Sequence, residues 1–380
     1  MSFWQSSALK CASAALAAAI LGCGPRDGAK DFSEGLAAYE LGDLKKAETL
    51  FARSAALAPQ DADRILYLAR TELELGELAE ARLQLAKAIA IAGDDADVRL
   101  LKAQVDWHAK SYEDAAKGFS EIAEDIRLEA SVRAQGWAGL GVVEMTCDNH
   151  HLARVAFLRA IRLDRRNAAA WYHLGLLYRD GFRYLESALE QFEIFVRLEA
   201  EASPRVQKVQ RTVIPGLKEE IARAAAERPG VAKRNSASCA ASISAAEAAV
   251  KKGNFKAARE AYQKALAADP LSYPAALGLA KAWERTDATK DGQTKAFENY
   301  KTACALRPSA VKTFLTAGSL AAKLGLNLQT VEIYSRAVAA NPNSLDAIDG
   351  LIRALRKIGG KDKEKAAAAY QAYRLSLARK

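Results

Sequence analysis

Apolar residues recur three and four positions apart along almost the whole chain, a spacing that places them on one face of an α-helix. Alternating runs of β-branched residues, which are typical of strands, are rare, and the 380 residues include only nine prolines. Glycine turns interrupt the helical pattern in LGDLKKA, LGELAEA and KGNFKAA. The pattern predicts an all-α chain of many short helices joined by turns.

The helices are expected to repeat, because a small residue followed four positions later by a bulky one returns every 34 to 38 residues, with one gap. The pairs are Ala47/Phe51, Ala81/Leu85, Ala115/Phe119, Ala153/Phe157, Ala188/Phe192, Ala258/Tyr262, Ala296/Tyr300, Thr330/Tyr334 and Ala366/Tyr370. These nine repeats predict two arrays of paired helices. Five repeats lie over residues 31–198 and about four over 241–380, and the last is a capping pair.

The stretch WYHLGLLY matches the consensus of one repeat family closely. Trp171, Leu174, Gly175 and Tyr178 are spaced as in the first helix of a tetratricopeptide repeat, and Phe192 follows as in its second helix. The chain therefore resembles tetratricopeptide repeat proteins, and the resemblance implies a right-handed α-solenoid that binds proteins and is not an enzyme. Small residues at the eighth position would let helices approach closely: Gly35, Ala69, Ala103, Gly141, Gly175, Ala246, Ala280, Gly318 and Gly350. Trp171 and its stripe are thus expected to pack, not to catalyse.

Other segments depart from the period. Residues 199–240 hold three prolines and are predicted to form a spacer with one helix, GLKEEIARAAAE, after Pro215, and a hinge near residues 229–238; a degenerate tenth repeat is the alternative. Two insertions, in ERTDATKDGQTKA and GGKDKEK, are expected to form loops on one rim.

The first residues differ from all that follow. Residues 1–22 hold one charge and a short apolar run, typical of a secretory signal, and Ile20-Leu21-Gly22-Cys23 resembles the bacterial lipobox. The resemblance implies a lipid on Cys23, a tether over residues 23–30, and, from Gly24, an outer-membrane lipoprotein of the cell envelope facing the periplasm. An ordinary cleaved signal, or an uncleaved anchor with the array in the cytoplasm, is the alternative.

Charge divides the chain. Residues 24–198 carry 23 Lys and Arg against 29 Asp and Glu, whereas residues 199–380 carry 31 against 17. The family resemblance implies groove residues at set positions of each first helix, which here are Tyr172, Leu176, Arg179 and Asp180 in the fifth repeat, and Lys251, Lys281, Arg285 and Lys323 in the second array. An acidic protein or peptide partner would suit the second array; a solvated basic face is the alternative.

The sequence contains few residue patterns typical of catalytic or cofactor-binding sites. It lacks phosphate-binding, zinc-protease and nucleophile-elbow motifs, so we expect no cofactor, no bound metal and no small-molecule substrate. Cys147, Asp148, His150 and His151 cluster at the turn of repeat four, so an enzyme site there or in the spacer is the alternative function. The basic residues are interspersed with acidic ones and lack aromatic partners, which argues against nucleic acid. Cys147, Cys239 and Cys304 are expected to be buried thiols, with a bridge between Cys239 and Cys304 as the alternative.

Overall fold

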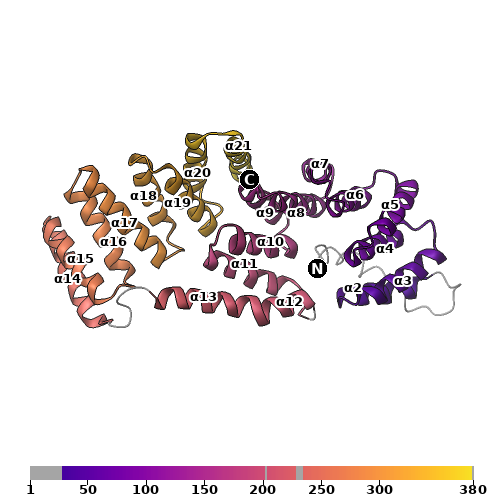
Figure 1. The fold of residues 1–380 in the computed structure, drawn as a ribbon, viewed down its shortest axis with the longest axis horizontal. Coiled ribbons are helices and arrows are strands. Elements are labelled where there is room, and N and C mark those ends of the chain that lie inside the picture. Colours follow the sequence, from indigo (N-terminus) through magenta and orange to yellow (C-terminus); the bar gives the residue numbers. More distant parts are fainter. Residues whose placement is uncertain (1–27, 202, 228–233, 379–380) are drawn as a thin grey trace. The chain divides into compact units, whose positions relative to one another are not determined.

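The computed structural model describes residues 28–201, 203–227 and 234–378, and within these ranges all regular structure is helical (Figure 1). The all-α prediction is therefore confirmed. The predicted signal segment, Cys23 and the start of the tether lie outside the described residues.

Contacts divide the chain into two compact units. Unit 1 comprises Met1–Arg183 with Ala188–Pro215, and unit 2 comprises Tyr184–Ser187 with Gly216–Lys380. The helices up to this division are α2 (Ala29–Glu40), α3 (Leu44–Leu57), α4 (Ala62–Leu75), α5 (Leu78–Ala92), α6 (Ala96–His108), α7 (Tyr112–Glu124), α8 (Ala130–Thr146), α9 (His150–Leu163), α10 (Ala168–Leu176), the π-helical turn η2 (Leu177–Gly181), α11 (Leu185–Leu198), α12 (Pro204–Lys208) and the π-helical turn η3 (Val209–Val213). They continue with α13 (Ile214–Ala226), α14 (Ser236–Lys251), α15 (Phe255–Ala268), α16 (Tyr273–Thr286), α17 (Lys290–Leu306), α18 (Val311–Lys323), α19 (Asn327–Ala340), α20 (Leu345–Ile358) and α21 (Lys361–Ala378).

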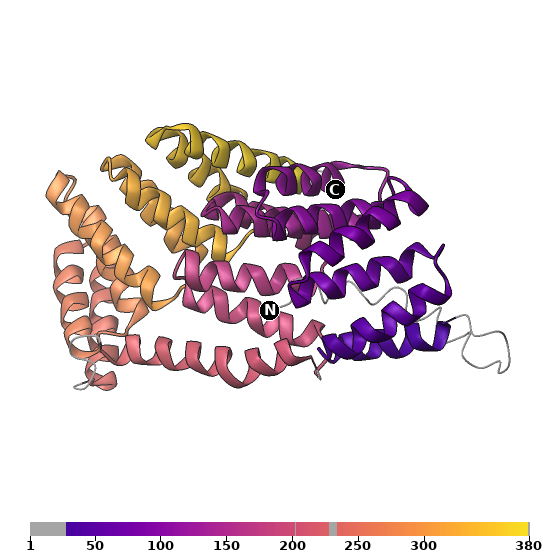
Figure 2. The ribbon, with the colours of Figure 1, turned by 45° about the vertical axis from the view of Figure 1, so that its right-hand side comes forward.

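Consecutive helices pack as antiparallel pairs, which is visible for α14 with α15 and for α4 with α5 (Figure 2). We call the first helix of each pair helix A and the second helix B. The turns between them follow from local chemistry. The three glycines of the predicted turns adopt positive φ, 78° at Gly42, 86° at Gly76 and 73° at Gly253, which side chains with a Cβ rarely tolerate. Helix B then begins at a polar cap, as where Asn254 accepts a hydrogen bond from the Ala257 amide at 3.0 Å.

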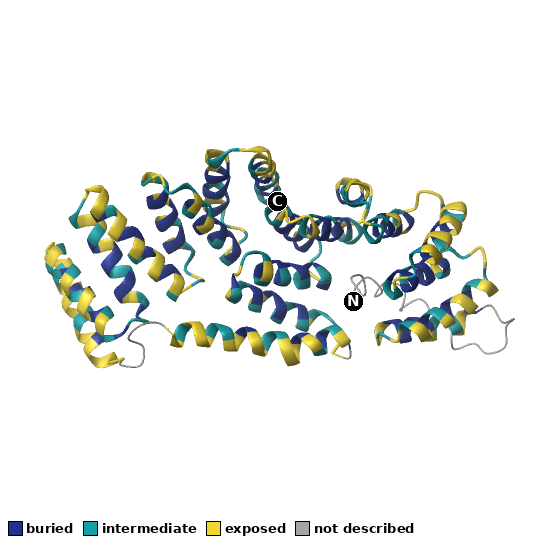
Figure 3. Ribbon diagram, viewed as in Figure 1, coloured by how far each residue is buried: buried dark blue, intermediate teal, exposed yellow. Residues whose placement is uncertain are grey.

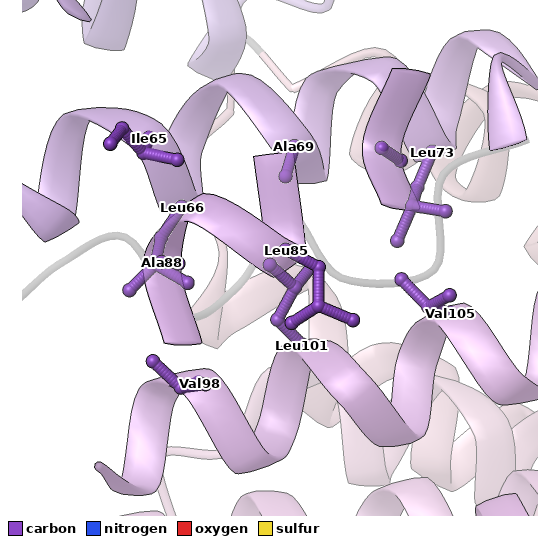
Figure 4. Close-up of a cluster of buried hydrophobic side chains, with 10 residues drawn as sticks. Ile65, Leu66, Ala69, Leu73, Leu85, Ala88, Val98, Leu101 and Val105 are labelled. Carbon is purple, nitrogen blue, oxygen red and sulfur yellow. The ribbon is translucent and has the colours of Figure 1, made fainter. Parts of the chain in front are cut away.

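One face of each helix is buried, so dark and light stripes alternate along the ribbons (Figure 3). All nine predicted pairs of small and bulky residues lie in this buried layer, from Ala47 and Phe51 to Ala366 and Tyr370. Figure 4 shows one segment of it, in which buried side chains of α4, α5 and α6, among them Leu73, Leu85 and Leu101, form one cluster, so that the third hairpin continues the core of the second. Each unit is thus a stack of helix hairpins, an α-solenoid.

Glycines of helix A face aromatic rings of helix B. A Cβ at Gly141 would lie 2.6 Å from the ring of Phe157, and a Cβ at Gly175 would lie 3.0 Å from that of Phe192. Of that stripe, Leu174, Gly175 and Tyr178 are buried and Trp171 is half-buried, and the Trp171 indole nitrogen donates to the Arg165 carbonyl oxygen at 2.9 Å. The stripe packs, as predicted.

A second set of glycines contacts the ring of the preceding repeat. Gly139 faces Phe119, Gly278 faces Tyr262, and Gly350 faces Tyr334 in the same way. Gly350 therefore does not hold the eighth position predicted for it, because Gly139 and Gly278 each lie two residues before that position. The eighth residue of α20 is Ile352, which is buried.

Both insertions lengthen helices and are not rim loops. Helix α17 has 17 residues and α21 has 18, against 14 in α15 and α19. An insertion close to one helical turn keeps the buried stripe on the same face, so helix B can absorb it.

The spacer helix begins earlier than predicted. Helical structure runs without a break from Pro204 to Ala226 and passes through Pro215. Proline has no amide hydrogen and crowds the carbonyl four residues before it, here that of Arg211. This carbonyl lies in the π-helical turn η3, whose wider backbone accommodates the ring.

Candidate protein-binding surface

The predicted groove residues of the fifth repeat contact their own unit. The Tyr172 ring lies 5.1 Å from the Phe195 ring, and the guanidinium of Arg205 lies 5.1 Å from the Tyr172 ring centroid. Tyr172 and Leu176 are both half-buried. These two residues hence present limited surface.

Arg179 and Asp180 neutralise each other. Both lie in the π-helical turn η2, and two short hydrogen bonds join the guanidinium to the carboxylate, Nε to Oδ1 at 2.6 Å and Nη2 to Oδ2 at 2.7 Å. The Asp180 carboxylate raises the pKa of Arg179, mainly through this hydrogen bond. An ion pair so close leaves little net charge for a partner.

The predicted groove residues of the second array are different. Lys251, Lys281, Arg285 and Lys323 are all exposed. Three of them, Lys251, Arg285 and Lys323, lie at or next to the last residue of helices α14, α16 and α18. They therefore occupy the same place in successive repeats, the carboxyl end of helix A.

The structure extends this series by one member that the sequence analysis missed. Lys357 lies next to the last residue of α20 and is exposed, as are Arg353 and Arg356 on the same helix. The error about Gly350 hid them, since it shifted the register of that repeat by two residues. We call Lys251, Arg285, Lys323 and Lys357 the terminal column of unit 2.

Helix A of unit 1 ends differently. The equivalent residues at the carboxyl ends of α2, α4, α6, α8 and η2 are Glu40, Glu74, His108, Thr146 and Asp180. Glu74 accepts a hydrogen bond of 2.6 Å from the hydroxyl of Tyr39. No residue of this series in unit 1 is Lys or Arg, so this structural position follows the charge split of the sequence.

At the turn of repeat four, His150 Nε2 lies 3.7 Å from Asp148 Oδ1. Cys147 is exposed, which corrects the prediction that it is buried, and the side chain of Asp148 is 94% exposed. The rings of His150 and His151 lie 5.9 and 5.4 Å from the ring of Phe182. Among the described residues, no three His, Cys, Asp or Glu side chains are grouped so that they could hold a metal ion.

Two other histidines are packed within unit 1. His173 is buried beside Phe157, at 6.0 Å between ring centroids, and burial lowers its pKa well below the ordinary value. Burial also lowers the pKa of His108. Both are therefore neutral at pH 7.

Cys239 and Cys304 are buried free thiols. Burial raises the pKa of Cys304 to about 12, so this thiol is protonated and unreactive at neutral pH. The alternative of a bridge between the two is not what the structure contains.

Across the part of the chain that the structure describes, no helix combines the length and the apolar character needed to span a bilayer.

Comparisons with known proteins follow the same repeats. Two family models, both described as tetratricopeptide repeat, match residues 38–105 and residues 6–62 with 243–309. A search of curated proteins finds no match.

Several solved structures are similar. One is PilF of Pseudomonas aeruginosa, at 16% identity over 68% of this chain and 98% of that one, with a TM-score of 0.36. Another is the Cut9–Hcn1 hetero-tetramer of APC/C, at 14% identity over 93% and 80%, with a TM-score of 0.34. A third is MamA, at 18% identity over 50% and 97%, with a TM-score of 0.31.

Tetratricopeptide repeats are protein-interaction modules and generally not enzymes. Both halves of this chain therefore contain tetratricopeptide repeats, within residues 38–105 and 243–309.

Proposed function

We propose that this protein is a non-enzymatic scaffold that binds an acidic segment of a partner protein along the terminal column of unit 2. We further propose that a lipid on Cys23 holds it at a membrane of the bacterial cell envelope, facing the periplasm. Its role there would be the assembly or export of envelope components.

The observation that carries the first proposal is the contrast between the two units. Cations at the carboxyl end of a helix are favoured by the helix dipole, worth about 0.3–1 kcal/mol each. That effect acts equally on every helix A. Yet the same position holds Glu40 and Glu74 in unit 1 and Lys251 and Lys323 in unit 2, so the dipole does not explain the basic column.

The charges of the terminal column are also not neutralised by ion pairs within the described residues. Lys251, Arg285, Lys323 and Lys357 form no ion pair within the described residues, and the guanidinium of Arg285 lies over the ring of Phe255, at 5.2 Å from its centroid. Carboxylates of a partner would therefore meet cations whose charge is available. Repeating the cation once per hairpin favours an extended or helical segment with several acidic residues over a single carboxylate.

The test measures binding of a fluorescent peptide with evenly spaced glutamates to the full chain. Replacing all four column residues by Gln should weaken binding at least tenfold, and the slope of log Kd against log salt should fall. The matched control replaces four exposed lysines of the same unit that lie outside the column, Lys256, Lys264, Lys312 and Lys365. Both variants lose the same charge, so equal losses of affinity would reject the column in favour of a solvated basic face.

The membrane proposal has its own test. Mass spectrometry of the mature protein from a bacterial host should find Cys23 as the first residue, with acyl chains attached, and Cys23→Ser should abolish both the lipid and the membrane fraction. An intact residue 1, or a mature chain that begins elsewhere, would reject lipidation and leave the binding proposal untouched.

A further inference from the structure

A pocket of 470 Å³ lies on the hairpin of α6 and α7, in the third repeat of unit 1. Its floor is formed by Ala103 and Gly118, where the two helices come so close that a Cβ at Gly118 would lie 3.1 Å from that of Ala103. Its walls are charged: α6 contributes Arg99, Lys102 and Asp106, and α7 contributes Asp114, Lys117 and Glu121.

The wall residues replace an apolar stripe. Counted from the start of each helix, Arg99, Lys102 and Asp106 of α6 stand where Trp171, Leu174 and Tyr178 stand in the fifth repeat. Leu174 and Tyr178 are buried there. Repeat three therefore gives up apolar packing along this stripe, which costs stability and leaves an opening between its helices.

Like charges face each other across the pocket. The helices run antiparallel and are level at Ala103 and Gly118, so Lys102 and Lys117 lie one residue to either side of that level, and Asp106 and Asp114 lie three and four residues beyond it on the same side. Burial is the main cause of the raised pKa of Asp106; Lys102 lowers this pKa, Asp114 raises it and Arg82 of α5 lowers it. The two lysines thus lie about one helical turn from the two aspartates.

These four side chains remain unpaired. Lys102, Lys117, Asp106 and Asp114 form neither a side-chain hydrogen bond nor an ion pair within 4.0 Å to any residue that the structure describes. A helix that needed only solubility would pair Lys102 with Asp106 one turn away.

The two arginines that line the pocket, Arg99 and Arg127, both donate hydrogen bonds to Asp125. Asp125 accepts hydrogen bonds from Arg127 Nε and Nη2, both at 2.8 Å, and one from Arg99 Nη1 at 3.3 Å. Because Asp125 pairs with both arginines, Lys102 and Lys117 are the lining cations available to a ligand.

We propose that this pocket binds a dipolar ligand, with its carboxylate between Lys102 and Lys117 and its ammonium group between Asp106 and Asp114. Residues one helical turn apart are separated by about 5–6 Å, so the two ligand groups are separated by that distance. An α-amino acid, whose charges are adjacent, is too short. A free ω-amino acid and the C-terminal lysine of a peptide share the required chemistry. The site is independent of the terminal column of unit 2.

Isothermal titration calorimetry on the full chain at low salt tests the proposal. The probes are 5-aminopentanoate for the free acid and Nα-acetyl-lysine for the peptide end, and the tighter one identifies the source. Pentanoate and pentylamine carry one charge each and should bind at least tenfold more weakly. The double variant Lys102→Gln/Lys117→Gln should weaken binding of the dipolar probe at least tenfold.

The matched control is Lys46→Gln/Lys87→Gln, which removes two exposed lysines of unit 1 outside the pocket and should leave the Kd within twofold. All four lysines are exposed, so thermal melting should show that both variants fold. Absence of binding by both dipolar probes, equal binding of pentanoate or pentylamine, or equal losses in the two variants would overturn the proposal.

Discussion

At the residue scale, the glycines of helix A decide how closely each hairpin packs. A Cβ at Gly141 would lie between 2.6 and 2.9 Å from three atoms of the Phe157 ring, and that ring is fully buried. The ring cannot move away without opening the contact with its neighbours, because interiors are close-packed.

We predict that Gly141→Ala lowers the free energy of unfolding by about 1–3 kcal/mol, since overpacking outweighs the helix propensity gained from alanine. Gly216→Ala is the control, because a Cβ at Gly216 in α13 would meet nothing within 4 Å. Alanine should stabilise the chain there by about 0.5–1 kcal/mol. Urea unfolding compares the two, and a stabilising Gly141→Ala would contradict the packing argument.

A buried carboxylate gives a second residue-scale prediction, which concerns pH. Glu72 is 5% exposed, one of its oxygens accepts from Gln84 Nε2 at 3.3 Å, and the other has no hydrogen bond among the described residues. Burial raises the pKa of Glu72 to about 7. The folded state thus holds a proton that the unfolded chain releases near pH 4.5, so this residue costs no stability below pH 4.5 and costs more as pH rises to 7.

Glu72→Gln should accordingly stabilise the protein by about 1–3 kcal/mol at pH 8 and change it little at pH 4.5. Melting curves at both pH values measure the difference, with the exposed Glu80→Gln of α5 as the control for loss of one charge. An equal shift of the melting temperature at the two pH values would show that Glu72 ionises as an exposed residue does.

At the scale of elements, the sequence predicted which helices form and which face each buries, because the stripe of Ala153 and Phe157 or of Ala296 and Tyr300 depends only on helical period. It could not predict where added residues go. The extra residues before the buried stripe of α17 could lengthen either the helix or the preceding loop. The spacing of apolar residues within the stripe is the same in both cases, so the sequence pattern does not distinguish them.

The predicted repeat register of α20 was wrong because a glycine of helix A can pack against a ring of its own hairpin or against a ring of the preceding one. Gly350 and Gly318 both contact the ring of Tyr334, one from the following helix A and one from its own. Sequence spacing alone does not show whether a glycine contacts the ring of its own hairpin or that of the preceding hairpin. This ambiguity is why the basic residues Arg353, Arg356 and Lys357 were not assigned to the surface, while Lys251, Arg285 and Lys323 were.

The path through Pro215 was unpredictable for a different reason. Proline usually ends a helix, and the π-helical turn η3 that accommodates it has no recognised sequence signal. The pocket of repeat three was equally hidden, although its signal was present: Arg99, Lys102 and Asp106 are polar where the repeat consensus is apolar.

At the scale of the whole molecule, a stack of hairpins has no single core, so each repeat is stabilised mainly by its neighbours. In unit 2, α18 packs on α17, α19 and α20, and α16 packs on α15 and α17. A defect in one hairpin should therefore loosen the adjacent hairpins more than distant ones.

Gly318→Ala provides such a defect, because its Cβ would lie 2.7–3.0 Å from three atoms of the buried Tyr334 ring. Hydrogen exchange followed by mass spectrometry should show the largest loss of protection in α18 and α19. Smaller losses are expected in α16, α17, α20 and α21, and the least change in α14. The exposed Lys312→Gln on α18 should leave protection unchanged. A uniform loss across α14–α21 would mean that the unit unfolds as one cooperative block, in which case coupling reaches beyond the nearest neighbour and the repeat is not its unit of stability.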